Sequence, residues 1–415
     1  MKHLKQNPLI VVIFTIFLDM LGFGILIPVI PLLLANPASA YYLLPSTMSI
    51  EQGYILLGLL TAVYPLGQFF ATPILGQMSD KYGRKRILRL SLIGTCLSYV
   101  LFALGIIVGS IPLLFFARFF DGITGGNISV AQAAIADITS PQDRSKNFGL
   151  VGMAFGLGFI FGPYLGGRLS DPSLVSWFNA ATPFWAAALL SLGNIILVSL
   201  MFPETHLKPN RELVVKWGQS LRNIVKAMSL GPLRPLLATN FLFQGGFTFF
   251  TTFFSVFLIH RFAFNQGNIG DFFAFTGVWI AITQGFITRK ASKIWREATI
   301  LRVSILGVAI ALFAYFVPTV AWQMLLVTPF FAIFVGLTQS NMTALISRSA
   351  GPEIQGEVLG INASVQALAQ TIPPVLSGFI AAQLSPTAPI AVSVCVIAAA
   401  GVLFLVGYKS TKLGV

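Results

Sequence analysis

The sequence predicts an all-α integral membrane protein with twelve transmembrane helices in two pseudo-symmetric six-helix halves. Of its 415 residues, 56% are hydrophobic and 9% are charged, whereas about a quarter of the residues of a soluble domain are charged. Apolar runs of about 20 residues recur along the chain, the length of helix that crosses a bilayer core of about 30 Å. Sequence features of the first half recur weakly at an offset of about 210 residues, as in transporters built from two parallel repeats.

The expected spans follow from the apolar runs and the polar residues between them. The first run begins near Pro8 and has no small-residue cleavage site before Pro28, so we expect a retained span rather than a signal peptide. The twelve spans are expected at residues 9–34, 53–76, 87–108, 111–138, 147–169, 182–202, 235–259, 270–288, 299–317, 321–346, 358–383 and 387–407.

The longest polar interruption divides the chain into an N-terminal half, 1–202, a linker, 203–234, and a C-terminal half, 235–415. Residues 213–228 of the linker mix apolar and basic side chains, which favours an amphipathic helix on the inner membrane surface. A solvated linker explains the same composition equally well.

The net charge of +13 is explained by membrane orientation. Lysine and arginine gather in alternate loops, which by the positive-inside rule places both termini in the cytoplasm. The chain is expected in the inner, cytoplasmic membrane. A nucleic acid partner is therefore not expected. Cys96 and Cys395 fall inside apolar runs and the three histidines lie at or beyond the membrane edges, so neither a metal site nor a cofactor is predicted.

Residues 76–86 form a cationic loop between the second and third spans. Asp80 is expected to pair with Arg84 or to accept from a helix N-terminus, while Gly76 and Gly83 permit close helix approach and a tight turn. A loop that only sets membrane orientation explains the charges, but neither Asp80 nor the glycine spacing.

Three charged residues fall inside the expected spans. Asp19 lies near the middle of the first, where an unpaired carboxylate costs at least a few kcal/mol. Carboxylates in apolar surroundings relieve such a cost by binding a proton, which is what a proton carrier requires. Arg118 and Asp121 share one face of the fourth span. The alternatives are a structural hydrogen bond for Asp19 and a self-neutralising pair that only fixes helix packing.

These patterns resemble the major facilitator superfamily. The loop 76–86 is similar to its signature loop, and the segments 18–24, 118–125 and 158–167 narrow the resemblance to drug/proton antiporters, tetracycline-resistance exporters in particular. The resemblance covers residues 9–205 well and the rest mainly by helix count. Those exporters carry an acid on the third helix where this chain has Ser98, which argues against tetracycline as the substrate.

The resemblance implies roles for three groups of residues. The loop would latch the cytoplasmic ends of the two halves in the outward-facing state, Arg118 would alternate between carboxylates and substrate, and the Gly-Pro pattern of the fifth span would mark an exporter. Small residues every fourth position also suit plain helix packing. The groups are proton-coupling Asp19, Arg118 and Asp121; latch residues Gly76, Asp80, Gly83, Arg84 and Arg86; and exporter-motif residues Gly158, Gly162, Pro163, Gly166 and Gly167.

Polar and aromatic side chains of the second half are candidates for lining a substrate cavity, although hydrogen bonds between helices and core packing explain them equally well. They are Asn240, Gln244, Phe247, Gln284, Gln339 and Asn341.

Together these features predict a proton-coupled antiporter, not an enzyme, that exports a small amphipathic or lipophilic, drug-like compound by alternating access. It would act as a monomer in the bilayer with protons and the small molecule as partners. A G-x-x-x-x-G-K-[ST] loop is absent from the sequence, which argues against a nucleotide-driven pump. The alternatives are a proton symporter that imports a nutrient or metabolite, and a membrane-embedded lipid-modifying enzyme.

Overall fold

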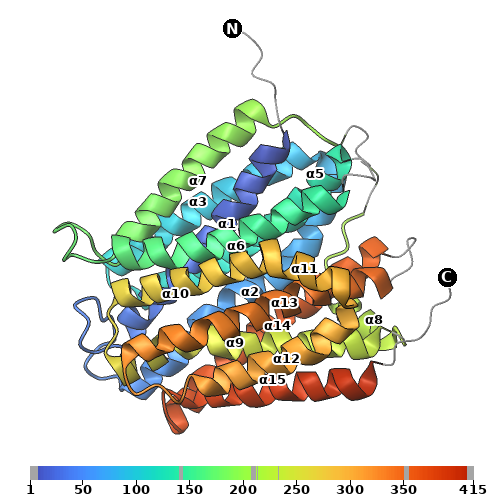
Figure 1. Cartoon of the computed structure of the whole chain (residues 1–415). Coiled ribbons are helices and arrows are strands. Elements are labelled where there is room, and N and C mark those ends of the chain that lie inside the picture. The colour runs from blue at the N-terminus through green and yellow to red at the C-terminus, as the bar shows by residue number, and fades with distance from the viewer. Residues whose placement is uncertain are drawn as a thin grey trace. The chain divides into compact units, whose positions relative to one another are not determined.

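The computed structural model describes residues 8–139, 144–206, 212, 214–231, 233–349 and 355–408. Helices and their connections make up the whole of this described part, and eleven of the helices are long and apolar enough to cross a bilayer. The predicted all-helical, multi-span fold is therefore confirmed (Figure 1). The elements are α1 Pro8–Leu34, α2 Ile50–Tyr82, α3 Arg84–Ile107, α4 Ile111–Thr124, η1 Gly125–Asn127, α5 Ile128–Ile138, α6 Arg144–Leu169, α7 Thr182–Met201, α8 Gln219–Ser229, α9 Arg234–Phe262, α10 Gln266–Ile282, η2 Thr283–Ile287, α11 Thr288–Ile294, α12 Glu297–Ala314, η3 Ala321–Gln323, α13 Met324–Ser349, α14 Gln355–Gln383 and α15 Ala388–Gly407.

The fourth expected span is broken rather than continuous, since the short 3₁₀ turn η1 separates α4 from α5. Two glycines of the turn lie against α2: a Cβ on Gly125 would come within 2.7 Å of the Tyr64 hydroxyl, and one on Gly126 within 3.0 Å of the Thr72 backbone. Glycine permits this approach, and the helix breaks there. With α4, η1 and α5 counted as one crossing, the described helices match the twelve predicted spans.

The first of two compact units comprises Met1–Gly53, Val63–Gln219 and Asn265–Ala274. Within it α1 packs along α6 and α7, and α3 packs on α7 and α4 (Figure 1). Because α1 is covered on several sides, most of its residues are buried, polar ones included.

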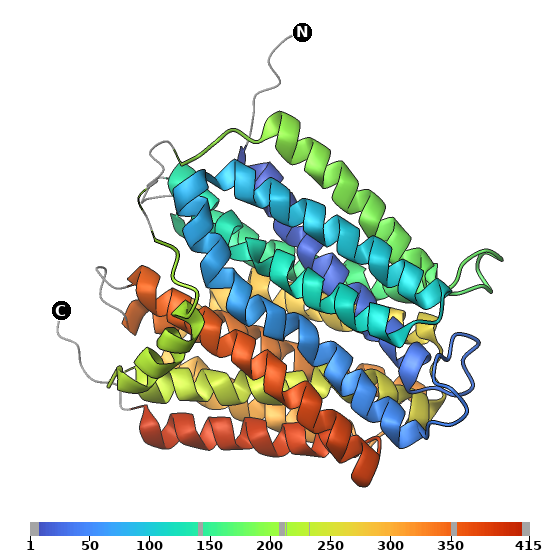
Figure 2. The same cartoon turned by 180° about the vertical axis from the view of Figure 1, so that it is seen from behind.

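The second unit comprises Tyr54–Ala62, Ser220–Phe264 and Phe275–Val415. Here α9 packs against α14 and α15 (Figure 2), and α12 packs against α13 and α15. The second unit includes part of α2 and the first unit includes part of α10, so these units differ from simple sequence halves. The division at 202 and 235 stays a prediction.

The linker contains α8, whose two faces differ in the expected way. Ser220 and Asn223 are buried, and Asn223 Nδ2 donates to Ser364 Oγ on α14 at 3.0 Å. Leu221 and Val225 on the opposite face are exposed. The helix is amphipathic, while its place on the membrane surface stays a prediction; residues 207–211, 213 and 232 of the linker lie outside the described residues.

Candidate functional site

Asp19 is buried in the first unit, with 6% of its surface exposed. Its Oδ1 accepts from Asn127 Nδ2 at 3.4 Å, and its Oδ2 has no hydrogen-bond partner within the described part of the chain. No cation pairs with this carboxyl in the same part. Asp19 therefore has the burial that the sequence predicts, without a counter-ion that would hold it ionised.

Arg118 and Asp121 form the ion pair that their spacing predicts, with Nη1 and Oδ2 2.8 Å apart and both side chains buried. The guanidinium also lies over the Tyr64 ring, 4.3 Å from its centroid. Gln68 Nε2 donates to the Tyr64 hydroxyl at 3.3 Å and to the Gly125 carbonyl at 3.1 Å. The pair is thus joined through α2 to the helix break that carries Asn127.

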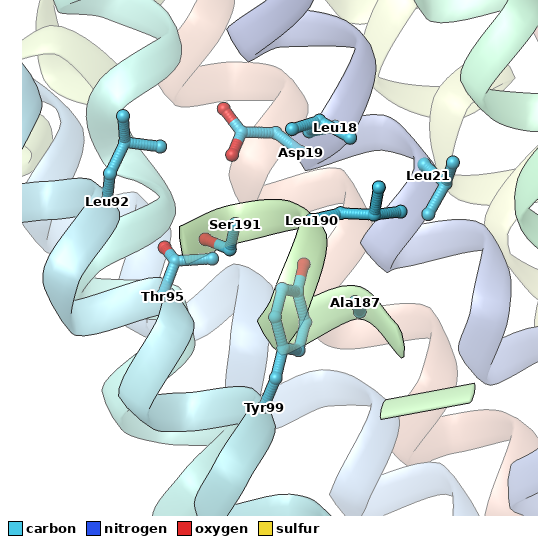
Figure 3. Close-up of a pocket in the computed structure, with 9 residues that line it drawn as sticks. All are labelled: Leu18, Asp19, Leu21, Leu92, Thr95, Tyr99, Ala187, Leu190 and Ser191. Atoms are coloured by element: carbon cyan, nitrogen blue, oxygen red, sulfur yellow. The ribbon is translucent and has the colours of Figure 1, made fainter. Parts of the chain in front are cut away.

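A small pocket lies beside Asp19, between α1, α3 and α7 (Figure 3). Asp19, Thr95, Tyr99 and Ser191 supply its polar groups, and the Tyr99 side chain extends with its hydroxyl toward α1. The hydroxyl fits because Gly22 has no Cβ, which would overlap it. The space accommodates about one water molecule, so it suits proton movement rather than a drug-sized substrate.

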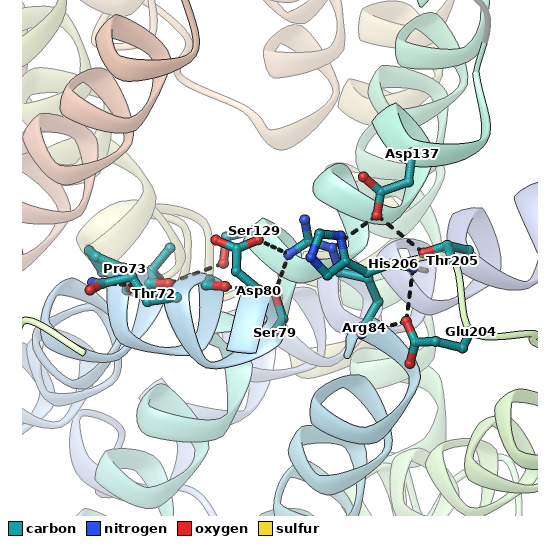
Figure 4. Close-up of polar contacts among 12 residues, drawn as sticks. Thr72, Pro73, Ser79, Asp80, Arg84, Ser129, Asp137, Glu204, Thr205 and His206 are labelled. Carbon is teal, nitrogen blue, oxygen red and sulfur yellow. Dashed lines mark hydrogen bonds and ion pairs between the residues drawn. The ribbon is translucent and has the colours of Figure 1, made fainter. Parts of the chain in front are cut away.

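The cationic loop forms a compact polar cluster with residues from other helices (Figure 4). Arg84 is the first residue of α3, is buried, and lies 2.6 Å from Asp80 and 3.0 Å from Asp137 at the end of α5. Its Nη1 also donates to Ser79 Oγ at 2.5 Å. The predicted Asp80–Arg84 pair is confirmed, and Asp137 extends it to the end of the broken span.

Glu204, just beyond α7, caps the amino end of α3. Its carboxylate accepts from the backbone N–H groups of Arg84 at 2.8 Å and Lys85 at 3.2 Å, where the helix dipole favours negative charge. Gly83 has φ of +95°, and a Cβ on it would collide with the Glu204 carboxylate. The predicted tight turn at Gly83 is confirmed.

The other two loop residues are less constrained. A Cβ on Gly76 would meet the Ser129 hydroxyl at an ordinary 3.7 Å, so close helix approach does not account for this glycine and that expectation is corrected. Arg86 lies over the Tyr82 ring, 5.9 Å from its centroid, at the end of α2.

The sequence model of the Major Facilitator Superfamily matches residues 12–374, and again residues 236–413. The chain belongs to this superfamily. Tetracycline resistance protein, class C, of Escherichia coli is 30% identical over 374 residues, which cover 90% of this chain and 89% of that protein. Multidrug resistance protein 2 of Bacillus subtilis is 28% identical over 381 residues, 91% and 89% of the two chains. The crystal structure of a D-xylose–proton symporter matches with a TM-score of 0.79 and 15% identity over 98% of this chain and 99% of that one, a likeness of fold alone.

Membership of the superfamily makes this chain a membrane transporter and excludes the lipid-modifying enzyme that the sequence left open.

The small residues of α6 in this chain pack against α1. A Cβ on Gly162 would lie 2.6 Å from the Leu21 carbonyl oxygen and 2.7 Å from the Gly24 Cα. Gly158 and Gly166 contact α1 in the same way, one turn to either side. On another face Gly167 meets Gly270 of α10, where Arg168 and Asp271 form an ion pair at 2.6 Å. The glycines thus take part in close helix packing, and the exporter interpretation of the pattern stays a prediction.

The candidate cavity residues lie in the second unit on α9, η2 and α13. Asn240 is buried and donates to Asn362 at 2.7 Å, and Asn341 donates to the Leu337 carbonyl of its own helix. Gln284 lies in the π-helical turn η2, a geometry common at functional sites. Phe247 is half-buried and stacks on Phe243 and Phe331; Gln244 and Gln339 are also half-buried. Their role in binding stays a prediction.

Sequence reasoning missed Asp137, Glu204 and Asn127. The first two were visible as acids at the ends of spans on the same predicted membrane side as the cationic loop. Asn127 was visible as a polar residue directly after Gly125 and Gly126 inside an apolar run. These features mark them as candidates for polar contacts between spans, but do not indicate which residue each one contacts.

Proposed function

We propose that this transporter is a proton-coupled antiporter that exports a small amphipathic or lipophilic compound by alternating access. The observation that carries the proposal is Asp19, a buried carboxyl without a paired cation, beside the buried Arg118–Asp121 pair. Of the two acids, Asp121 already has its counter-ion. Asp19 is therefore the group that neutralises itself by taking up a proton.

In the proposed cycle Asp19 is protonated from outside and releases its proton inward as substrate leaves. The cationic loop, with Asp80, Arg84 and Asp137, latches one of the two states. Both termini lie in the cytoplasm and the protein acts as a monomer in the inner membrane.

Two observations support export of a drug-like compound. The relatives named for tetracycline and multidrug resistance match about nine-tenths of the chain, and the Gly162-Pro163 pattern occurs on α6. The half-buried Phe247 suits a lipophilic substrate. Moving one charge across 100 mV provides about 2.3 kcal/mol, or about a 50-fold gradient at 1.4 kcal/mol per decade. One proton per substrate is thus sufficient for useful efflux.

Accumulation of cationic dyes and antibiotics in cells that carry the protein tests the proposal. We expect lower accumulation than in cells without it, and a protonophore should erase the difference while ATP remains available. Accumulation that instead rises with the proton gradient would make the protein a symporter and would remove the exporter interpretation of Gly162 and Pro163.

A further inference from the structure

Asn127 is fully buried and is placed by the helix break against Asp19. The break is stabilised by side chains: Gln68 Nε2 donates to the Gly125 carbonyl at 3.1 Å, and Ser129 Oγ donates to the Gly126 carbonyl at 2.9 Å. The Gly125 and Gly126 carbonyls at the break therefore accept hydrogen bonds, as buried carbonyls in stable structures do. Because of the helix break, the amide of Asn127 rather than an apolar side chain lies against the carboxyl of Asp19.

The side chains of Asn127 and Asp19 form one hydrogen bond, and one oxygen atom of each has no hydrogen-bond partner within the described residues. Asn127 Nδ2 donates to Asp19 Oδ1 at 3.4 Å. Asp19 Oδ2 and Asn127 Oδ1 are both buried and lack a hydrogen-bond partner within the described residues. An ionised carboxylate cannot bond the amide oxygen, because both atoms are acceptors. A proton on Oδ2 would turn it into a donor.

We propose that Asn127 is a positioning residue that holds the carried proton on Asp19. In the proton-loaded state Asp19 Oδ2–H donates to Asn127 Oδ1 while Asn127 Nδ2–H donates to Asp19 Oδ1, so that two antiparallel hydrogen bonds join acid and amide. The proton arrives from water on one side of the membrane and returns to water on the other, and no other bond changes. This inference rests on the proposed role of Asp19.

An amide suits this position because it carries a donor and an acceptor side by side and serves both protonation states. An arginine or lysine there would hold the carboxylate ionised. The titratable groups around Asp19 are Tyr64 of α2, Tyr99 of α3 and the Arg118–Asp121 pair of α4. Arg118 forms an ion pair with Asp121 at 2.8 Å, whereas Asp19 accepts its hydrogen bond from the Asn127 amide.

Infrared difference spectra of the reconstituted full chain, taken between low and high pH, test the pair. Asp19→Asn should remove one carboxylic acid C=O band, which identifies it. Asn127→Leu, which keeps the branching of the side chain but none of its polar atoms, should move that band to higher wavenumber, because the carboxyl loses both hydrogen bonds. A residue that only fills space would leave the band where it is, so an unmoved band in Asn127→Leu overturns the proposal.

The exchange variant, Asp19→Asn with Asn127→Asp, keeps the test decisive if Asn127→Leu does not fold. It rebuilds the acid–amide pair with the partners swapped, so the band should return near its original position. Proton-coupled transport, which Asp19→Asn alone should lack, should reappear, because position 127 then supplies the proton-binding carboxyl and position 19 the amide. No gain over the single variant overturns the proposal. Uphill transport that survives Asp19→Asn instead overturns the proton-carrier function itself, whatever the band does.

Discussion

Two arginine–aspartate ion pairs of the first unit differ mainly in burial, and neutralising their acids should therefore have very different costs. Arg118 and Asp121 lie 2.8 Å apart with side chains 5% and 7% exposed. Arg168 and Asp271 lie 2.6 Å apart with side chains 37% and 43% exposed. Asp121→Asn and Asp271→Asn keep the side-chain volume, so the comparison isolates the charge.

Breaking a buried pair costs about 3–5 kcal/mol because the remaining charge is left without a partner. We expect about 3 kcal/mol for Asp121→Asn, the lower end, since the amide can keep one hydrogen bond to Arg118. A solvent-exposed pair is worth at most about 1 kcal/mol, so Asp271→Asn should cost no more than that. The difference of about 2 kcal/mol is about 30-fold in the unfolding equilibrium constant.

Equilibrium unfolding of the purified variants in mixed micelles of mild detergent and SDS measures both losses. The double variant Arg118→Met with Asp121→Leu should regain most of the stability, because an apolar pair replaces a buried ionic one at little cost. Its transport should stay lost if Arg118 is part of the mechanism. Equal losses for the two Asp→Asn variants, or an active double variant, would refute the reasoning.

Three further predictions concern the latch and the α1–α6 contact. Gly83→Val should slow interconversion between states without abolishing substrate binding, because φ of +95° and the Glu204 carboxylate both exclude a side chain. Ligand titration measures binding and cysteine accessibility measures interconversion. Lost binding with normal interconversion would contradict this prediction. Glu204→Gln keeps an acceptor oxygen but removes the charge at the amino end of α3, so it should weaken the cap by about 0.3–1 kcal/mol and change the same accessibility. An unchanged accessibility profile would show that the cap does not affect the latch. Gly162→Val should lower thermal stability, whereas Gly156→Val, where a Cβ meets nothing within 4 Å, should not; equal melting temperatures would contradict the packing argument.

Hydropathy and charge were sufficient to predict the helices, because a bilayer requires long apolar helices and sets their order across it. The break between α4 and α5 could not be predicted in this way, since Gly125 and Gly126 are tolerated in continuous spans as well. At the break Gly125 and Gly126 lie against Tyr64 and Thr72 of α2, and such contacts between helices are not visible in the sequence.

In the candidate site, too, local contacts were predictable from the sequence and contacts between distant segments were not. The pairs Asp80–Arg84 and Arg118–Asp121 were predictable because their members are one helical turn apart. The contacts of Asp137 and Glu204 with Arg84, and of Asn127 with Asp19, join residues 53 or more positions apart in sequence. Sequence spacing carries no signal for such contacts.

The central claim is that Asp19 carries the proton that drives export. Its most direct test is proton movement driven by a substrate gradient in liposomes that contain the purified protein and a trapped pH-sensitive dye. We expect a pH change coupled to substrate movement in the unmodified protein, and substrate exchange without a pH change in Asp19→Asn. The same coupled pH change in Asp19→Asn would contradict it.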